Sequence, residues 1–294
     1  RFGKMKGSDE RFKNAGGVIG VDEKGNAKYD IPPGKNGDAV SAAQPSGSRA
    51  SELCEAFAAV DDPITRREFN DALQNVNQFK AAGPDGWTAG ALRVLPEAIK
   101  SVMFELSAAI HRTGILPTSY RAATVICLAK GNSAFTATNH RPITLMQHIM
   151  KVQEKIYLTR IKKVLEECPE IFNGSHQCGG IRARSTHDAA RLLLVIIEDA
   201  LSRHNDDWDP SNPEYEGLWL FSSDVAAAFD GITEASKEVA LRRLGLPEKF
   251  IQFVKEAQSG APRRVRFDDG SFSKKFHLYR GASQGSLLSP FIWL

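Results

Sequence analysis

The sequence lacks the features that identify a membrane, secreted or zinc-binding protein. No apolar run approaches the roughly 18 residues of a membrane span, and the first residues, RFGKMKGSDERF, contain no apolar signal core. The lack of such a run predicts no membrane partner. Only four cysteines occur, and no CxxC pair is present, which predicts reduced thiols and an intracellular protein. The spacing of Cys168, His176, Cys178 and His187 fits no familiar zinc site.

Two enzyme signatures are also missing. No GxxxxGK[ST] occurs, which excludes a P-loop nucleotidase, and GASQG does not have the GxSxG spacing of a serine hydrolase. No methionine opens the chain, so we expect a fragment of a longer protein.

The composition is that of a folded protein with weak overall charge. The chain has 294 residues, 42% of them hydrophobic and 25% charged, which is enough for one large or two smaller domains. The net charge of +3 alone says little about nucleic acid. Local basic groups could meet phosphates or be solvated faces, and they lie at 162–163, 182–184, 263–266 and 274–275.

The pattern along the chain predicts a disordered start followed by mixed structure. Residues 1–50 are rich in Gly, Ser, Lys and Pro without periodicity, so we expect a disordered linker. Apolar spacing predicts helices over 89–113, 145–165 and 186–201, followed by two helices after Asp230. A strand is expected over 123–129, and alternation around Asp269-Gly270 predicts a hairpin.

Asp224 is the first candidate site residue. It follows GLWLF (217–221), a short apolar run typical of a buried strand. A carboxylate at the end of such a strand is costly to bury unless it is paired, protonated or bound to a divalent cation. A simple turn-capping role fits the same pattern, so the residues alone leave both interpretations open.

Five segments together carry a family resemblance. In order, AAGPDGW, LAKGNSAFTATNHRPITL, HQCGGIRARSTHDA, SSDVAAAFD and YRGASQGSLLSP resemble the fingers and palm of a reverse transcriptase of the non-LTR retrotransposon type. The resemblance covers about residues 51–294. It implies an α+β right-hand polymerase fold, with fingers over 51–216, an incomplete palm over 217–294, and helices packed on an antiparallel sheet.

The resemblance implies roles for the residues around Asp224. Asp224 matches the first catalytic, metal-binding aspartate, and the carbonyl of Val225 matches an additional metal ligand. The ion expected from the reaction is Mg²⁺, although no residue distinguishes it from Mn²⁺. Phe229 matches a steric gate that excludes the ribose 2′-hydroxyl, although packing within the palm would also explain an aromatic ring here. Asp230 is expected to support the turn.

Four further residues match nucleotide contacts of the family. Lys130 and Arg141 match two fingers cations that grip the triphosphate, although Lys130 could equally be a solvated cation at a strand end. Gln284 and Gly285 match a loop that contacts the nucleotide and the template. The implied partners are an RNA template, a DNA primer and deoxynucleoside triphosphates, and a retrotransposon product would work in the nucleus. The sequence indicates no oligomeric state.

A second aspartate pair resembles a catalytic motif but is in the wrong place. In RFDDG, Asp268 and Asp269 lack the spacer after the aromatic residue and precede RGASQG, so we interpret them as turn residues. The second aspartate motif and the thumb are then missing, and we expect this chain to be catalytically incompetent alone. The alternative is a decayed or repurposed domain that binds RNA or acts as a scaffold.

Overall fold

The computed structural model describes residues 18–21, 27–29, 48–130, 139–168, 171, 177–181, 184–202, 218, 220–225 and 228–293. The chain divides into two compact units, residues 1–43 and 44–294. In the first unit, strands β1 (Val18–Val21) and β2 (Ala27–Tyr29) pair antiparallel. They lie within the segment 1–50, where the sequence pattern indicates no regular element.

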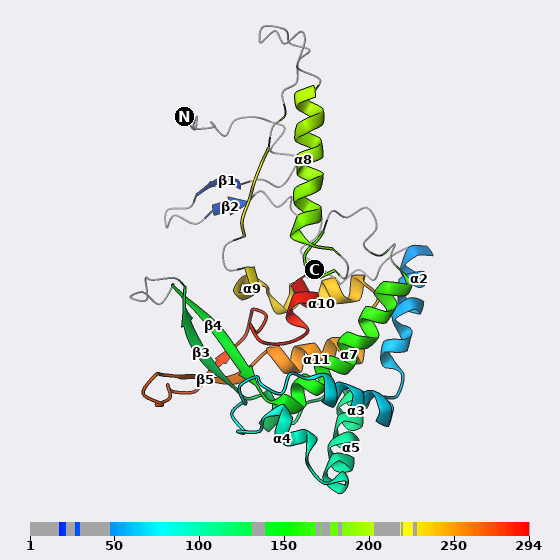
Figure 1. Ribbon diagram of the computed structural model, residues 1–294, viewed down its shortest axis with the longest axis vertical. Helices are drawn as coiled ribbons and strands as arrows, with labels where there is room; N and C mark the ends of the chain where they lie inside the picture. The colour runs from blue at the N-terminus through cyan, green and yellow to red at the C-terminus, as the bar shows by residue number, and fades with distance from the viewer. Residues whose placement is uncertain are drawn as a thin grey trace, which may run out of the picture. The chain divides into compact units, whose positions relative to one another are not determined.

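The second unit contains a four-stranded sheet of order β4-β3-β5-β6 (Figure 1). Its strands are β3 (Ala123–Ala129), β4 (His140–Met146), β5 (Ala261–Arg266) and β6 (Phe276–Leu278). β3 pairs antiparallel with β4, and β5 with β6, but β3 and β5 run parallel. The prediction of an antiparallel sheet is therefore wrong at the central pair, because a long connection that includes β4 separates β3 from β5 and brings the chain back in the same direction.

Helices make up most of the remaining structure. Within the described residues, none is both long and apolar enough to cross a membrane. The helices are α2 (Ser48–Ala58), the 3₁₀ helix η1 (Ala59–Asp61), α3 (Arg66–Asn75), α4 (Ala89–Arg93), α5 (Glu97–Thr113), α6 (Thr118–Arg121), α7 (His148–Glu167), α8 (Thr186–Ser202), α9 (Ala228–Gly231), α10 (Glu234–Arg243), α11 (Glu248–Gln258) and α12 (Ser289–Trp293).

Several predicted elements differ from the structure in ways that have local causes. The helix expected over 89–113 is two helices, because Pro96 precedes the first turn of α5 and cannot continue α4. Leu145 and Met146, expected in a helix, belong to β4, where they pair with β3. The predicted buried strand before Asp224 is wrong in its described residues: Leu218 and Leu220 are exposed and lie outside the sheet.

Other elements are confirmed. β3 spans the predicted residues, α8 begins after Ser185, and α10 and α11 follow Asp230. The backbone nitrogen and hydroxyl of Ser185 both donate to the carboxylate of Asp188, as a helix-capping pair does. The turn at Asp269-Gly270 joins β5 to β6, and Gly270 has a φ of 82°.

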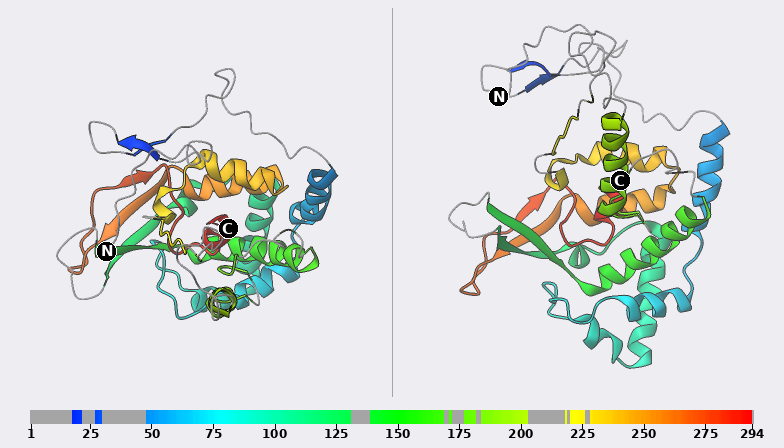
Figure 2. Two further views of the ribbon diagram at one scale, coloured as in Figure 1. Left: turned by 90° about the horizontal axis from the view of Figure 1, so that it is seen from above. Right: turned by 45° about the horizontal axis from the view of Figure 1, so that its top comes forward.

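Helix α7 connects two parts of the hydrophobic core. On one side, the Tyr157 ring packs against Phe250 and Phe253 of α11, with ring centroids 5.0 and 4.9 Å apart. On another, Ile156 belongs to a cluster with Phe69 of α3. The sheet lies to one side of α7 and α11 in both views of Figure 2. α7 is therefore a rigid frame for the segments that follow β4.

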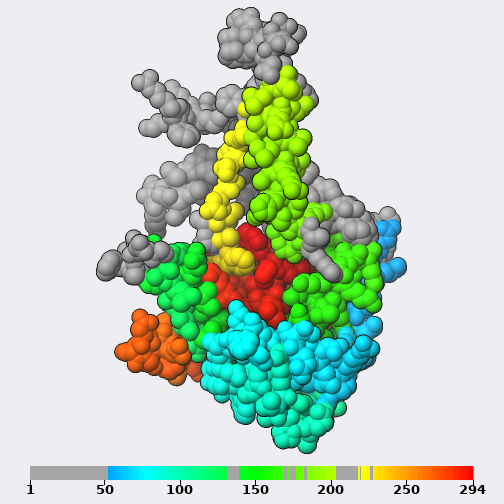
Figure 3. Space-filling model, viewed as in Figure 1, coloured from blue at the N-terminus to red at the C-terminus, as the bar shows by residue number. Residues whose placement is uncertain are grey.

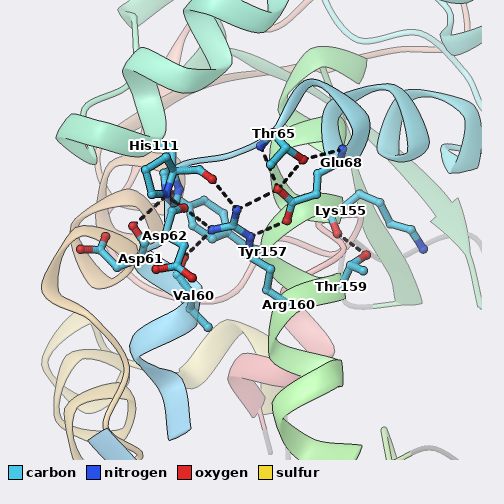
Figure 4. A network of polar contacts seen from close by, with 11 residues as sticks. Val60, Asp61, Asp62, Thr65, Glu68, His111, Lys155, Tyr157, Thr159 and Arg160 are labelled. Carbon is cyan, nitrogen blue, oxygen red and sulfur yellow. Dashed lines mark hydrogen bonds and ion pairs between the residues drawn. The ribbon is translucent and has the colours of Figure 1, made fainter. Parts of the chain in front are cut away.

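The side chain of Arg160 ties α7 to the segment before α3 (Figure 4). Its Nε and Nη2 donate to the two carboxylate oxygens of Glu68, at 2.7 and 2.9 Å. Its Nη1 donates to the carbonyls of Val60 and Asp62, and its Nη2 also donates to that of Pro63 at 3.2 Å. A guanidinium offers five donors in a fixed plane, so one side chain binds three backbone carbonyls and a carboxylate at once.

The loop 280–285 docks on β4 through a very close backbone contact. The Thr144 nitrogen donates to the Gln284 carbonyl at 2.7 Å. Gly285 has a φ of 141°, and a Cβ added there would lie 2.2 Å from the Thr144 oxygen. Only glycine fits this position, because a side chain would collide with fixed backbone.

The ion pair between Arg160 and Glu68 predicts a pH-dependent stability. Burial acts to raise the pKa of Glu68, but the hydrogen bonds and charge of Arg160, with help from Thr65, lower it to about 2. This stabilisation is complete above the ordinary pKa near 4.5 and is lost as the pH falls through about 2. Since Glu68 is one-third exposed, we expect Glu68→Gln to cost about 1–2 kcal/mol at pH 7 in urea unfolding.

The control for this prediction is Glu105→Gln on α5, an exposed carboxylate. It should change the free energy of unfolding by less than about 0.5 kcal/mol. The cost of Glu68→Gln should shrink steadily below pH 4.5, and a cost that is independent of pH would contradict the assignment.

The docking of Gly285 predicts an asymmetry between two glycine substitutions. Gly270→Ala only places an alanine in the left-handed backbone conformation, because nothing lies within 4 Å of the added Cβ. It should cost about 1–2 kcal/mol in urea unfolding. Gly285→Ala carries similar strain and the collision with Thr144, so it should cost about 1–3 kcal/mol more. Equal costs for the two variants would show that the close contact is absent.

Candidate functional site

Three segments that are distant in sequence meet at one place. The Ala282 nitrogen donates to the Phe229 carbonyl, and the Gly281 nitrogen to the Ile232 carbonyl, both at 2.7 Å. The same loop continues to Gln284 and its bond with Thr144. The loop 280–285 therefore joins the end of SSDVAAAFD to the β3–β4 pair, as the adjoining coloured segments in Figure 3 illustrate.

A pocket of about 270 Å³ opens where these segments meet. Val125 and Thr144, directly opposite each other on β3 and β4, form part of one wall, and the loop 280–284 forms another. The charged residues of its lining are Asp230 and Arg280. Such a concave site with an apolar wall and a few polar groups is the usual form of a small-ligand site.

Lys237 of α10 binds the backbone of the loop 280–285. Its side chain is 2% exposed, and its Nζ donates to the Gly281 carbonyl at 2.9 Å. It also donates to a Glu234 carboxylate oxygen at 2.5 Å and to Gln258 Oε1 at 3.3 Å. The buried ammonium thus uses its donors to fix the backbone beside the pocket.

Gln284 and Gly285 lie at the end of the loop that docks on β4. The Gln284 side chain is partly exposed and lines the pocket, while its carbonyl is bound by Thr144. Gly285 follows with no side chain and is exposed. Its bare backbone is accessible for close approach by a ligand.

Phe229 lies at the edge of this arrangement. Its carbonyl accepts from Ala282, and its ring lies beside the Trp293 ring, with centroids 5.8 Å apart and an interplanar angle of 32°. The ring is partly buried. The structure thus fixes the backbone of Phe229 and limits the directions that its side chain can take.

Asp224 and Val225 are exposed in the segment that leads to α9. Within the described part of the chain, no group of three or more His, Cys, Asp or Glu side chains could hold a metal ion. Mg²⁺ commonly binds to one or two carboxylates together with substrate phosphates and water. Asp224 with the Val225 carbonyl therefore fits part of the shell of one such ion, but not a closed site for two.

The two predicted fingers cations do not line the pocket. Arg141 pairs with Leu128 across the ladder, and alternation along β4 places it on the face opposite Pro142 and Thr144. Lys130 follows β3, and its nitrogen donates to the Asn139 carbonyl at 2.6 Å. Both side chains are exposed near the outer end of the hairpin. The cation that does line the pocket is Arg280.

The location of Asp230 also differs from what the sequence indicated. It lies in the short helix α9 and lines the pocket, whereas the sequence indicated only that it would support a turn. Arg280 and Thr144 sit inside motifs that the sequence singles out, so neighbouring signals could have found them. Lys237 carries no such signal, because polar residues are expected on the exposed face of an amphipathic helix.

Comparison with known proteins places these motifs in a family. Residues 128–294, more than half of the chain, match the family model described as reverse transcriptase (RNA-dependent DNA polymerase). The matched region begins at the end of β3 and contains every predicted site residue.

Curated relatives show the same likeness over most of the chain. The chain is 26% identical over 254 residues to a "Retrovirus-related Pol polyprotein from type-2 retrotransposable element R2DM" of Drosophila melanogaster, covering 85% of this chain and 22% of that protein. It is 26% identical over 231 residues to the corresponding polyprotein of a type-1 element R2 of Popillia japonica, covering 79% and 29%.

A third relative is an "RNA-directed DNA polymerase from mobile element jockey" of Drosophila funebris, 25% identical over 236 residues and covering 79% of this chain and 24% of the relative. The chain thus spans between about a fifth and a third of the length of these proteins. From the matched residues and their order, this chain belongs to the reverse transcriptase (RNA-dependent DNA polymerase) family.

Proposed function

We propose that this chain is part of a non-LTR retrotransposon polyprotein that copies RNA into DNA, and that the pocket beside the loop 280–285 receives the incoming deoxynucleoside triphosphate. The observation that supports this most is the joining of three family motifs by backbone hydrogen bonds around one pocket. The relatives are described as Pol polyproteins and as an RNA-directed DNA polymerase of mobile elements.

The chemistry needs a divalent cation, taken to be Mg²⁺, which supplies Lewis-acid stabilisation of the triphosphate and activation of the primer hydroxyl. Asp224 and the Val225 carbonyl would hold this ion. One carboxylate is insufficient for a two-ion centre, so other carboxylates must complete it. We therefore infer that residues 1–294 do not polymerise alone, and Mg²⁺-dependent primer extension by this chain on an RNA template would contradict that inference.

The remaining residues would bind and orient the nucleotide. Gln284 can donate and accept through its amide, and Gly285 allows the template or the nucleotide to approach the backbone closely. Arg280 is placed to meet phosphate oxygens at the pocket, since guanidinium matches phosphate geometry. Lys130 and Arg141, on the outer part of the hairpin, would reach the triphosphate or the template only if that hairpin closes over the site.

Phe229 would set the choice of sugar. Its carbonyl accepts a hydrogen bond from Ala282, which fixes the backbone from which the ring projects, five residues after Asp224 in the same motif. A ring that occupies the space of a ribose 2′-hydroxyl excludes ribonucleotides through steric repulsion.

A second candidate function is RNA binding without synthesis. The exposed basic residues of the β5–β6 region favour it, because Arg264, Arg266, Lys274 and Lys275 could contact phosphates whether or not the site is catalytic. The two functions differ in what Asp224 does, and this difference makes them separable.

Substitution of Asp224 tests the first function against the second. Asp224→Asn should weaken Mg²⁺-dependent binding of a deoxynucleoside triphosphate at least about tenfold, because the metal loses its charged ligand. RNA affinity should change less than about twofold. Titration calorimetry or fluorescence with nucleotide and RNA checks both quantities, and Asp268→Asn, an exposed turn aspartate, is the matched control.

Two results would reject the polymerase site. One is a nucleotide affinity that Asp224→Asn leaves unchanged, and the other is an equal loss in Asp268→Asn. A loss of RNA binding in Asp224→Asn would place that residue in the RNA-binding surface.

Substitution of Phe229 tests the steric gate. Phe229→Val should raise the affinity for a ribonucleoside triphosphate relative to its deoxy counterpart about tenfold, because space opens beside the 2′-carbon. Competition binding with the two nucleotides measures this ratio, with Phe272→Val in the β5–β6 region as control. If both variants leave the ratio unchanged, Phe229 has only a packing role.

A further inference from the structure

Glu154 of α7 is a buried carboxylate that the proposed function does not use. The residue is 1% exposed, and both of its oxygens accept hydrogen bonds from the segment that follows Gly285. Ser286 Oγ donates to Oε1 at 2.7 Å, and the Leu287 nitrogen donates to Oε2 at 2.8 Å. Burial of an ionisable group is costly, so this contact needs an explanation beyond filling space.

The contact reaches a tightly bonded turn. Ser286 Oγ also accepts from the Leu288 nitrogen at 3.1 Å, and the Ser286 nitrogen donates to the Ser283 carbonyl at 3.1 Å. Ser289 Oγ donates to the same carbonyl at 2.9 Å. These bonds bracket Gln284 and Gly285, so a constraint applied at Ser286 is transmitted to both residues.

The loop is held from two sides by one continuous piece of chain. β4 binds the Gln284 carbonyl through Thr144, and α7 binds Ser286 and Leu287 through Glu154. β4 ends at Met146 and α7 begins at His148, so only Gln147 separates the two anchoring elements. The register of the loop against β4 is thus fixed at two points of a single rigid frame.

Burial, two hydrogen bonds and one nearby charge act on the pKa of Glu154. Burial raises the pKa of Glu154 to about 7, against the hydrogen bonds from Ser286 and Leu287 and the charge of Lys151, which lower it. Lys151 lies one turn earlier on α7 and is itself 8% exposed. A carboxylate with both oxygens bound by donors holds the loop most firmly when ionised.

We propose that Glu154 is a positioning residue that fixes Gln284 and Gly285 against β4 and thereby sets the affinity of the pocket for the incoming nucleotide. The inference rests on the proposed function for its second half, but the anchoring itself can be measured without any nucleotide. A purely structural role would stabilise the fold without a specific effect on this loop.

A matched pair of serine variants separates the two roles. Ser286 and Ser107 are both buried, and each donates its hydroxyl to a side-chain oxygen on α7, Ser286 to Glu154 and Ser107 to Gln153. Only Ser286 belongs to the segment that follows Gly285 and is bonded to the loop 280–285, through Ser283. Ser286→Ala and Ser107→Ala therefore each remove one buried hydroxyl that donates to α7, in the first case next to the loop 280–285 and in the second on α5.

The experiment is hydrogen exchange by mass spectrometry on the whole chain, followed by titration with a deoxynucleoside triphosphate and Mg²⁺. Glu154→Ala and Ser286→Ala should speed exchange at Thr144 and Leu287 at least about tenfold and weaken nucleotide binding about fivefold. Glu154→Gln should lie between wild type and Glu154→Ala, because its amide can accept from Leu287 and donate to Ser286 Oγ. Ser107→Ala should change neither quantity at the loop.

Three results would overturn the proposal: unchanged exchange in Ser286→Ala, equal effects in Ser107→Ala, or loosened exchange with an unchanged nucleotide affinity. Ser286→Ala is the decisive variant if Glu154→Ala does not fold. If the wild-type chain binds no nucleotide, the proposed function fails, while the exchange data still decide whether Glu154 anchors the loop.

Discussion

The architecture of the candidate site depends on the absence of a side chain at position 285. A Cβ there would lie 2.2 Å from the Thr144 oxygen, so the loop can form its bond to β4 only through glycine. Once docked, the loop presents Ala282 and Gly281 to the backbone at Phe229 and Ile232. One steric constraint thus links the sheet to the segment that carries Asp224.

Buried charges hold this arrangement together by binding backbone. Arg160 binds the carbonyls before α3, Lys237 binds the Gly281 carbonyl, and Glu154 binds the Leu287 nitrogen. Lys237 and Glu154 are buried and Arg160 is partly buried, and hydrogen bonds to fixed backbone offset the desolvation cost of each group only in one geometry. The charges therefore favour a single placement of the connecting segments, which a site for a small ligand requires.

The sequence predicts local elements and motif neighbours better than long-range pairing. The apolar run 123–129 specifies β3, whereas the single helix expected over 89–113 was wrong because it ran through Pro96, which cannot continue a helix. The parallel pairing of β3 and β5 could not be predicted, because the register between strands that are far apart in the sequence depends on the whole connection between them. The contact of Glu154 could not be predicted either, since Ser286 lies 132 positions away in the sequence. In its local sequence, Glu154 looks like any other polar residue of a helix.

The most direct test of the account is photochemical labelling of the chain with a photoreactive thymidine triphosphate analogue and Mg²⁺, mapped by mass spectrometry. The account predicts labels within 224–231 and 280–289, competed by unmodified deoxynucleotide and reduced by Asp224→Asn. Labels confined to α8 or to the β5–β6 region, or labels insensitive to Asp224→Asn, would contradict a nucleotide site built on the loop 280–285.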